Sequence, residues 1–207
     1  LTDYFYPDKK EFYNNRIEYD IRKDKIPYSD NSVDNIYISH VIEHIETKFV
    51  KNFIEEAFRV LKPGGVLRIV TVDARFLFEV SQFDNDFWHW RIDNLKDQQT
   101  YETDWDKLER FDFLIKETAK PRFRFYKNKV EDKVLDINKI KNLNFEEFRS
   151  LAMQNLDFRE DYPNDHISIW DFDSLNKLGL LVGFKNILLS KYLGSVSLKM
   201  QGSHFDK

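Results

Sequence analysis

Cysteine is absent from the 207 residues of this chain. Its absence excludes disulfide bonds, thiolate nucleophiles and zinc sites built on cysteine. Glycine is also scarce: six residues are few for an α/β protein that holds a nucleotide. No apolar run of about eighteen residues is present, so we predict no membrane span, and we see no signal peptide. Together these absences favour a cytoplasmic protein.

Charge is not concentrated on one sign. The formal net charge is -4 and the isoelectric point is about 5.8, whereas a general nucleic-acid binder is normally basic. We therefore expect no nucleic-acid partner. A chain of this length can bury one substantial core with an appended subdomain.

The best-defined pattern is a strand–helix–strand unit. Residues 35–39 (NIYIS) are short, β-branched and aromatic, which predicts a buried strand. In residues 46–62 the apolar side chains recur at three- and four-residue spacing, which predicts an amphipathic helix with Lys62 in its last turn. The sequence KPGG should end that helix. The apolar run at 66–72 then predicts a parallel strand that is covered on both faces.

The same theme returns near the end of the sequence. Asp171 or Asp173 can cap a helix that ends at Gly183. Residues 184–190 (FKNILLS) then predict a further strand.

A long segment of different character lies between these α/β parts. Residues 74–165 are rich in aromatic side chains, and an insertion of this length is usually a functional lid or cap. We therefore predict an α/β core at 1–73, a largely helical lid at 74–165 and a return to the core at 166–207. Helical patterns within the lid lie at 86–95, 104–119 and 144–156.

Three stretches carry a family resemblance when they are taken in order. IPYSDNSVDNIYISHVIEHI, EEAFRVLKPGGVLRIVTVD and the closing HISIWDFDSLNKLGLLVGFKN resemble the class I S-adenosylmethionine-dependent methyltransferases with S-H-V-x-E-H and L-K-P-G-G motifs. The resemblance implies a Rossmann-like methyltransferase sheet with helices on both faces and an aromatic-rich helical insertion after the fifth strand. It implies S-adenosyl-L-methionine as cofactor, bound by the core, and S-adenosyl-L-homocysteine as product.

Part of the family pattern is not found. The acidic-Gly-x-Gly-x-Gly loop and the acid that ends the second strand are both missing. The opening LTDYFYP corresponds to the exit from that second strand, so we expect a preceding segment of about 40 residues. The alternative is a true loss of this segment and an inactive enzyme.

The resemblance assigns candidate residues to the cofactor. Ligands of such folds bind at the carboxyl ends of the parallel strands. Asp20 and the backbone N–H of Ile21 would hold the adenine ring, the alternative for Asp20 being a solvated turn. Ser39, His40 and Val41 would pass the methionine end of the cofactor, and Ser39 can also cap a helix.

Catalysis requires alignment of the acceptor and, for a hydroxyl acceptor, removal of a proton. The candidate catalytic residues are His40, His166 and Asp73, which lie where the chain leaves a strand or returns from the lid. A histidine with a pKa of about 6.5 can take a proton at neutral pH. We expect both imidazoles to face the acceptor, with at least one of them as the base or a metal ligand.

The motif HVIEH has three interpretations. On a helix, His40, Glu43 and His44 would share one face and could hold a divalent metal, with His166 or Asp73 as a further ligand. Some class I O-methyltransferases use E-x-x-E-H in this way, but here His40 replaces the first glutamate. The second interpretation is a metal-free histidine base. The third is a structural corner in which Glu43 braces the next helix or the lid.

Two other classes of protein stay open at this point. H-x-x-E-H is also the signature of inverted-motif zinc proteases, although a protease would place it within a long helix. A methyltransferase fold that only binds a partner, without catalysis, is the second alternative.

The acceptor is suggested by a basic stretch in the lid, KPRFRFYKNK at 120–129. On a strand, Arg122 and Arg124 would share one face and could grip a phosphate or carboxylate, the alternative being a solvated face. If these arginines bind an anionic group, the predicted reaction is O-methylation of a small polar or anionic metabolite or sugar derivative.

Overall fold

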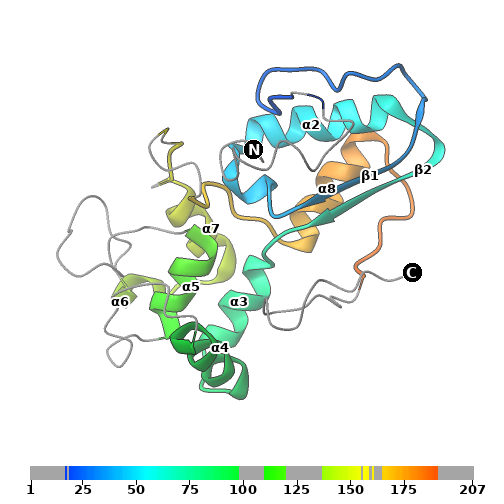
Figure 1. Cartoon of the computed structure of the whole chain (residues 1–207). Coiled ribbons are helices and arrows are strands. Elements are labelled where there is room, and N and C mark those ends of the chain that lie inside the picture. The colour runs from blue at the N-terminus through cyan, green and yellow to red at the C-terminus, as the bar shows by residue number, and fades with distance from the viewer. Residues whose placement is uncertain are drawn as a thin grey trace.

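The computed structural model describes residues 17, 19–97, 110–119, 137–154, 156–158, 160 and 165–190. Figure 1 shows two groups of elements, one around a small parallel sheet and one made of helices. In chain order the elements are β1 (Val33–Ser39), a 3-10 turn η2 (Ile42–His44), α2 (Thr47–Val60), β2 (Leu61–Val70), α3 (Ala74–Ser81), α4 (Asp86–Asp97), α5 (Arg110–Ala119), α6 (Ile137–Ile140), α7 (Phe145–Met153) and α8 (Phe172–Val182).

The unit β1–α2–β2 confirms the predicted order strand–helix–strand. The expected burial of the two strands is wrong for the described residues, because no residue of β1 and only Leu61 of β2 is buried. The two strands are parallel, with partners running from Asn35 and Val66 to Ser39 and Val70. The helix ends at Val60, two residues earlier than predicted, because Leu61 already has an extended backbone and begins β2. Gly64 has a φ of +83°, the left-handed conformation that favours glycine, and it lies in the irregular first part of β2, before the regular pairing begins at Val66.

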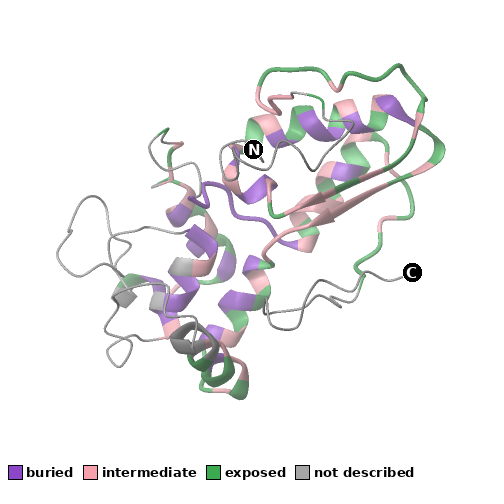
Figure 2. Ribbon diagram, viewed as in Figure 1, coloured by how far each residue is buried: buried purple, intermediate pink, exposed green. Residues whose placement is uncertain are grey.

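One face of this sheet is covered by α2 and α8. Alternate residues of the strands, Ile36, Ile38, Leu67 and Ile69, pack into a core formed by the apolar stripe of α2 together with Trp170 and residues of α8. The opposite face carries Tyr37 and Val66, which are 48% and 56% exposed. Among the described residues the sheet therefore has two strands and one covered face (Figure 2), and the larger sheet with helices on both faces stays a prediction.

Helix α8 begins and ends as predicted. The side chain of Asp171 caps it by accepting from the Ser174 N–H, and Gly183 ends it with a φ of +118°. The strand predicted at 184–190 is wrong for this structure, because no described segment pairs with it. Leu188 and Leu189 are accordingly 84% and 69% exposed.

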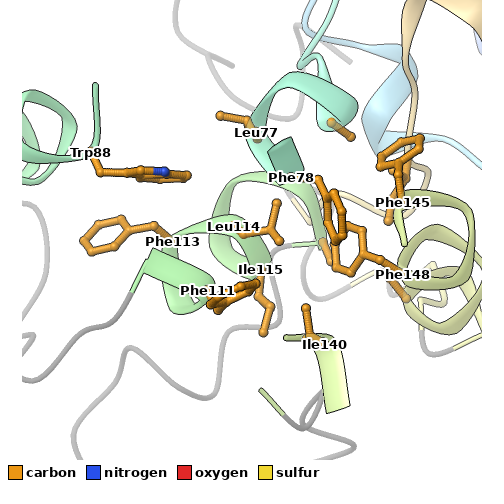
Figure 3. Close-up of a cluster of buried hydrophobic side chains, with 14 residues drawn as sticks. Leu77, Phe78, Trp88, Phe111, Phe113, Leu114, Ile115, Ile140, Phe145 and Phe148 are labelled. Atoms are coloured by element: carbon orange, nitrogen blue, oxygen red, sulfur yellow. The ribbon is translucent and has the colours of Figure 1, made fainter. Parts of the chain in front are cut away.

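Helices α3 to α7 share a second core, shown in Figure 3. Its largest fully buried side chains are those of Trp88, Phe113 and Phe148. The rings of Phe78 and Phe148 stack at 5.3 Å, and the Trp88 indole donates to the Val80 carbonyl (2.7 Å). These contacts confirm that the aromatic residues form a helical core. They do not test the proposed boundaries at 73 and 165.

The three helical patterns in this region are confirmed as α4, α5 and α7, although residues 104–109 of the second pattern lie outside the described part. None of the described helices combines the length and apolar character that a membrane crossing requires.

Candidate functional site

The motif HVIEH does not form a continuous helix. The strand β1 ends at Ser39, and His40 follows with a φ of +51°, a conformation that few residues other than glycine adopt. Its backbone N–H donates to the Val70 carbonyl (2.9 Å), which ties this corner to the end of β2. The His40 side chain is 56% exposed at the carboxyl end of the sheet. The shared helical face expected for His40, Glu43 and His44 is therefore wrong, and the helical setting of a zinc protease is missing.

Glu43 lies at the centre of the site, and its charged side chain is buried there. The residue is 2% exposed, within the 3-10 turn that follows His40. Its carboxylate accepts from His40 Nδ1 at 2.9 Å through Oε1 and from Thr71 Oγ1 at 3.0 Å through Oε2. The Glu43 carbonyl accepts from the N–H groups of Ile167 (2.7 Å) and Ser168 (3.2 Å). Glu43 thus joins the ends of both strands to the segment that leads from the helical group to α8.

The pKa of Glu43 reflects two opposing effects. Burial raises the pKa, while the hydrogen bond from His40 and the nearby charge of His166 lower it, and the net result is a pKa below the ordinary value. The carboxylate is therefore ionised at neutral pH and can orient the His40 imidazole. Because Nδ1 of His40 donates to the carboxylate, Nε2 is the nitrogen that carries the lone pair of the neutral ring.

His44 and His166 meet next to this carboxylate. Their ring centroids are 4.8 Å apart, and the rings are inclined at 71°. Nδ1 of His44 donates to the Asp165 carbonyl (3.0 Å), and Nδ1 of His166 donates to the Glu117 carbonyl of α5 (2.7 Å). A carbonyl only accepts, so Nδ1 carries the proton in both rings and Nε2 has the lone pair when the ring is neutral.

The structure therefore brings together a different metal-ligating set from the one predicted. Glu43, His44 and His166 each offer one donor atom, and these atoms lie within 4.8 Å of one another. His40 was predicted as a member of this set. Its exposed side chain instead donates to the Glu43 carboxylate. His166, predicted as a further ligand, belongs to the set, whereas Asp73 does not.

The remaining predicted site residues lie at the same end of the sheet. Ser39 is the last residue of β1, and Val41 precedes the 3-10 turn without a side-chain cap. Asp73 is exposed and caps α3 by accepting from the Phe76 N–H at 3.1 Å. A cap is a sufficient structural reason for this aspartate, so its catalytic role stays a prediction.

Asp20 lies in a turn, as its alternative interpretation predicted. Its carboxylate accepts from the backbone and side chain of Arg22, at 3.0 and 3.2 Å, and these hydrogen bonds lower its pKa to about 2. A third hydrogen bond from Arg22 (3.3 Å) and the Lys23 ammonium (3.3 Å) also reach this carboxylate. These contacts fill the roughly four lone-pair positions of an ionised carboxylate, so an adenine amine would have to displace one of them. No described contact tests this role or that of the Ile21 N–H.

Several contacts of the site were not predicted from the sequence. Thr71 and the carbonyl groups of Glu117 and Asp165 fix the carboxylate and the two imidazoles. Backbone carbonyls leave no signal in the sequence, and Glu117 is remote from His166 along the chain. The basic stretch with Arg122 and Arg124 lies outside the described residues.

Comparison with protein families matches residues 6–69 to a family described as a methyltransferase domain. The matched segment covers less than half of the chain and contains β1, the HVIEH corner, α2 and most of β2. No curated protein and no solved structure matched the chain. The match to a methyltransferase domain agrees with the resemblance of the sequence motifs to the class I S-adenosylmethionine-dependent methyltransferases.

Proposed function

We propose that the protein transfers a methyl group from S-adenosyl-L-methionine to a hydroxyl oxygen of a small polar or anionic molecule. One observation carries the proposal: an exposed imidazole, His40, is held by a buried carboxylate at the carboxyl end of the sheet of a methyltransferase domain. In parallel α/β folds, this edge is where ligands bind.

The residues present suit the cofactor. Asp20 and the Ile21 N–H offer an acceptor and a donor for the adenine, and Ser39 to Val41 would line the methionine end. The positive φ of His40 lies at this edge, directly after β1, and such strained conformations cluster at functional sites. The bound cofactor supplies an activated methyl on a sulfonium, and the protein supplies orientation and proton removal.

His40 would act as the general base. Its Nε2 would accept the hydroxyl proton of the acceptor as the new bond to carbon forms. Glu43 would hold the ring in the required tautomer and stabilise the imidazolium, because its ionised carboxylate accepts from Nδ1 at 2.9 Å. His166 is 7% exposed and bonded to the lid. That burial makes it a less suitable base than His40.

The acceptor class rests on the composition of the lid. The cationic side chains between 120 and 129 would bind a phosphate or carboxylate of the acceptor, and the aromatic core of the lid would help to exclude water. The alternative is a domain that binds a partner without transferring a methyl group.

Methyl transfer to a panel of sugar phosphates, hydroxy acids and uncharged sugars tests the proposal. S-adenosylhomocysteine should accumulate with anionic acceptors in the presence of the full-length protein and should not accumulate without an acceptor. Cofactor binding with no turnover across such panels would favour the non-catalytic alternative.

A further inference from the structure

The strongest unassigned feature is the cluster of Glu43, His44 and His166. Its three donor atoms lie within 4.8 Å of one another, close enough for one ion to contact all three. We propose that this cluster is a metal site for a divalent ion of borderline softness, of which Zn²⁺ is the representative. The proposal concerns ion binding and does not rest on the proposed methyl transfer.

The two imidazoles are oriented as metal ligands are. Histidines that bind metals almost always donate their other ring N–H to a carbonyl or carboxylate, which fixes the tautomer. His44 donates Nδ1–H to the Asp165 carbonyl at 3.0 Å, and His166 donates Nδ1–H to the Glu117 carbonyl at 2.7 Å. Both rings therefore present Nε2 with its lone pair, which is the form that binds a cation.

The third donor is a carboxylate that the fold keeps charged and buried. Glu43 is 2% exposed, and the side chains that donate to its carboxylate are the neutral hydroxyl of Thr71 and the imidazole of His40. A carboxylate has about four lone-pair positions, so these two bonds and the hydrogen bond from its own backbone N–H leave capacity for an ion. A cation would offset the cost of burying this charge.

The ligands are also held rigidly by the backbone. The N–H groups of Ile167 and Ser168 bond to the Glu43 carbonyl, and Ser168 Oγ donates to the Ile42 carbonyl at 2.7 Å. The Trp170 indole donates in turn to Ser168 Oγ at 2.7 Å. This network fixes the turn with Glu43 and His44 against the segment with His166. Such support is what a preformed metal site requires.

The donor chemistry selects the class of ion. Imidazole nitrogen suits Zn²⁺ and its first-row neighbours, whereas Mg²⁺ prefers oxygen ligands. Two histidines and one glutamate are a known donor combination for zinc, and three protein ligands leave a position for water or another oxygen. Zn²⁺ should therefore bind in preference to Mg²⁺.

Calorimetry with Zn²⁺ and with Mg²⁺ on the full-length protein tests the site. His44→Asn and His166→Asn each keep an N–H that can donate to the same carbonyl and remove the Nε2 donor. Each should weaken Zn²⁺ binding by more than about 100-fold. Loss of a group that only orients a ligand costs about 10- to 100-fold, and loss of the ligand itself should cost more. His89→Asn is the control, because His89 is a surface histidine of α4 beside Asp84. The His89→Asn variant should bind Zn²⁺ with the affinity of the wild type.

Three results would overturn the assignment: no one-to-one Zn²⁺ binding, equal affinity for Mg²⁺, or unchanged Zn²⁺ affinity in either asparagine variant. Circular dichroism checks that the variants fold. If either does not fold, the ring resonances of the wild-type histidines decide. Those of His44 and His166 should shift with Zn²⁺ and that of His89 should not, and the reverse would contradict the site.

Discussion

His40 combines three properties that rarely occur in one residue. Its backbone has a φ of +51°, its side chain is 56% exposed, and its Nδ1 lies 2.9 Å from an almost completely buried carboxylate. A positive φ outside glycine has a conformational cost, and such strain clusters at functional sites. The strain here places the imidazole at the edge of the sheet with its orientation fixed by Glu43.

The proposed role of His40 as a base predicts the effect of His40→Asn. Asparagine tolerates a positive φ and can still donate to Glu43, but it has no basic nitrogen. Turnover should fall about 10²–10⁴-fold, roughly 3–5 kcal/mol, with nearly unchanged affinity for S-adenosylhomocysteine. Steady-state kinetics and calorimetry on the same samples measure both. If the variant keeps turnover within about tenfold of the wild type, the corner is structural.

At the level of elements, Arg75 of α3 joins the helical group to α8. Its Nε lies 2.8 Å from Asp171 Oδ2 and its Nη2 lies 2.7 Å from Glu146 Oε1 on α7. The Ala74 N–H also donates to the Trp170 carbonyl at 3.0 Å. Burial raises the pKa of Asp171, but the hydrogen bonds from Ser174 and Arg75 outweigh it and lower the pKa below its ordinary value. The charged form of Asp171 therefore stabilises the fold.

The lowered pKa predicts a pH-dependent effect of Asp171→Asn. Asparagine keeps the helix cap but loses the charge, so unfolding should need about 1 kcal/mol less near neutral pH, a value discounted for the partly exposed Arg75. A carboxyl with a lowered pKa stabilises above its unfolded pKa of about 3.8 and loses that effect as the pH falls through its folded pKa.

Thermal unfolding of both proteins from pH 7 to pH 2 measures this effect, with Asp171→Ala as the comparison that also removes the cap, at a further cost of about 1 kcal/mol. The difference in stability between wild type and Asp171→Asn should begin to narrow below about pH 4 and should vanish once the pH is below the folded pKa. A gap that stays constant over this range would show that the charge does not stabilise the fold.

Across the whole molecule, the features that can be predicted from the sequence are those whose physical cause lies within a short segment of the chain. Helices α2, α4, α7 and α8 follow from apolar spacing and caps within their own segments. The strand predicted at 184–190 fails because a strand needs a hydrogen-bonded neighbour, which no described segment supplies. The meeting of His166 with Glu43 depends on the path of the lid and on backbone carbonyls, and neither has a pattern in the sequence.

The two cores also define how the molecule is arranged. The sheet and its covering helices form one core, and α3 to α7 form the other, with the segment from Asp165 to Asp171 passing between them. The candidate site lies where that segment meets the ends of β1 and β2. Any ligand of the sheet edge would therefore lie beside the helical group, which is the arrangement that the proposed lid role needs.

The most direct test of the account is calorimetric titration of the full-length protein with S-adenosylhomocysteine. The match of residues 6–69 to a methyltransferase domain and the ligand-binding edge proposed at Ser39 and His40 predict one-to-one binding with a Kd of about 1 μM or below, which corresponds to about -8 kcal/mol. Adenosine alone should bind more weakly, since it lacks the amino-acid end. Neither heat nor a thermal shift at millimolar S-adenosylhomocysteine would contradict the central claim.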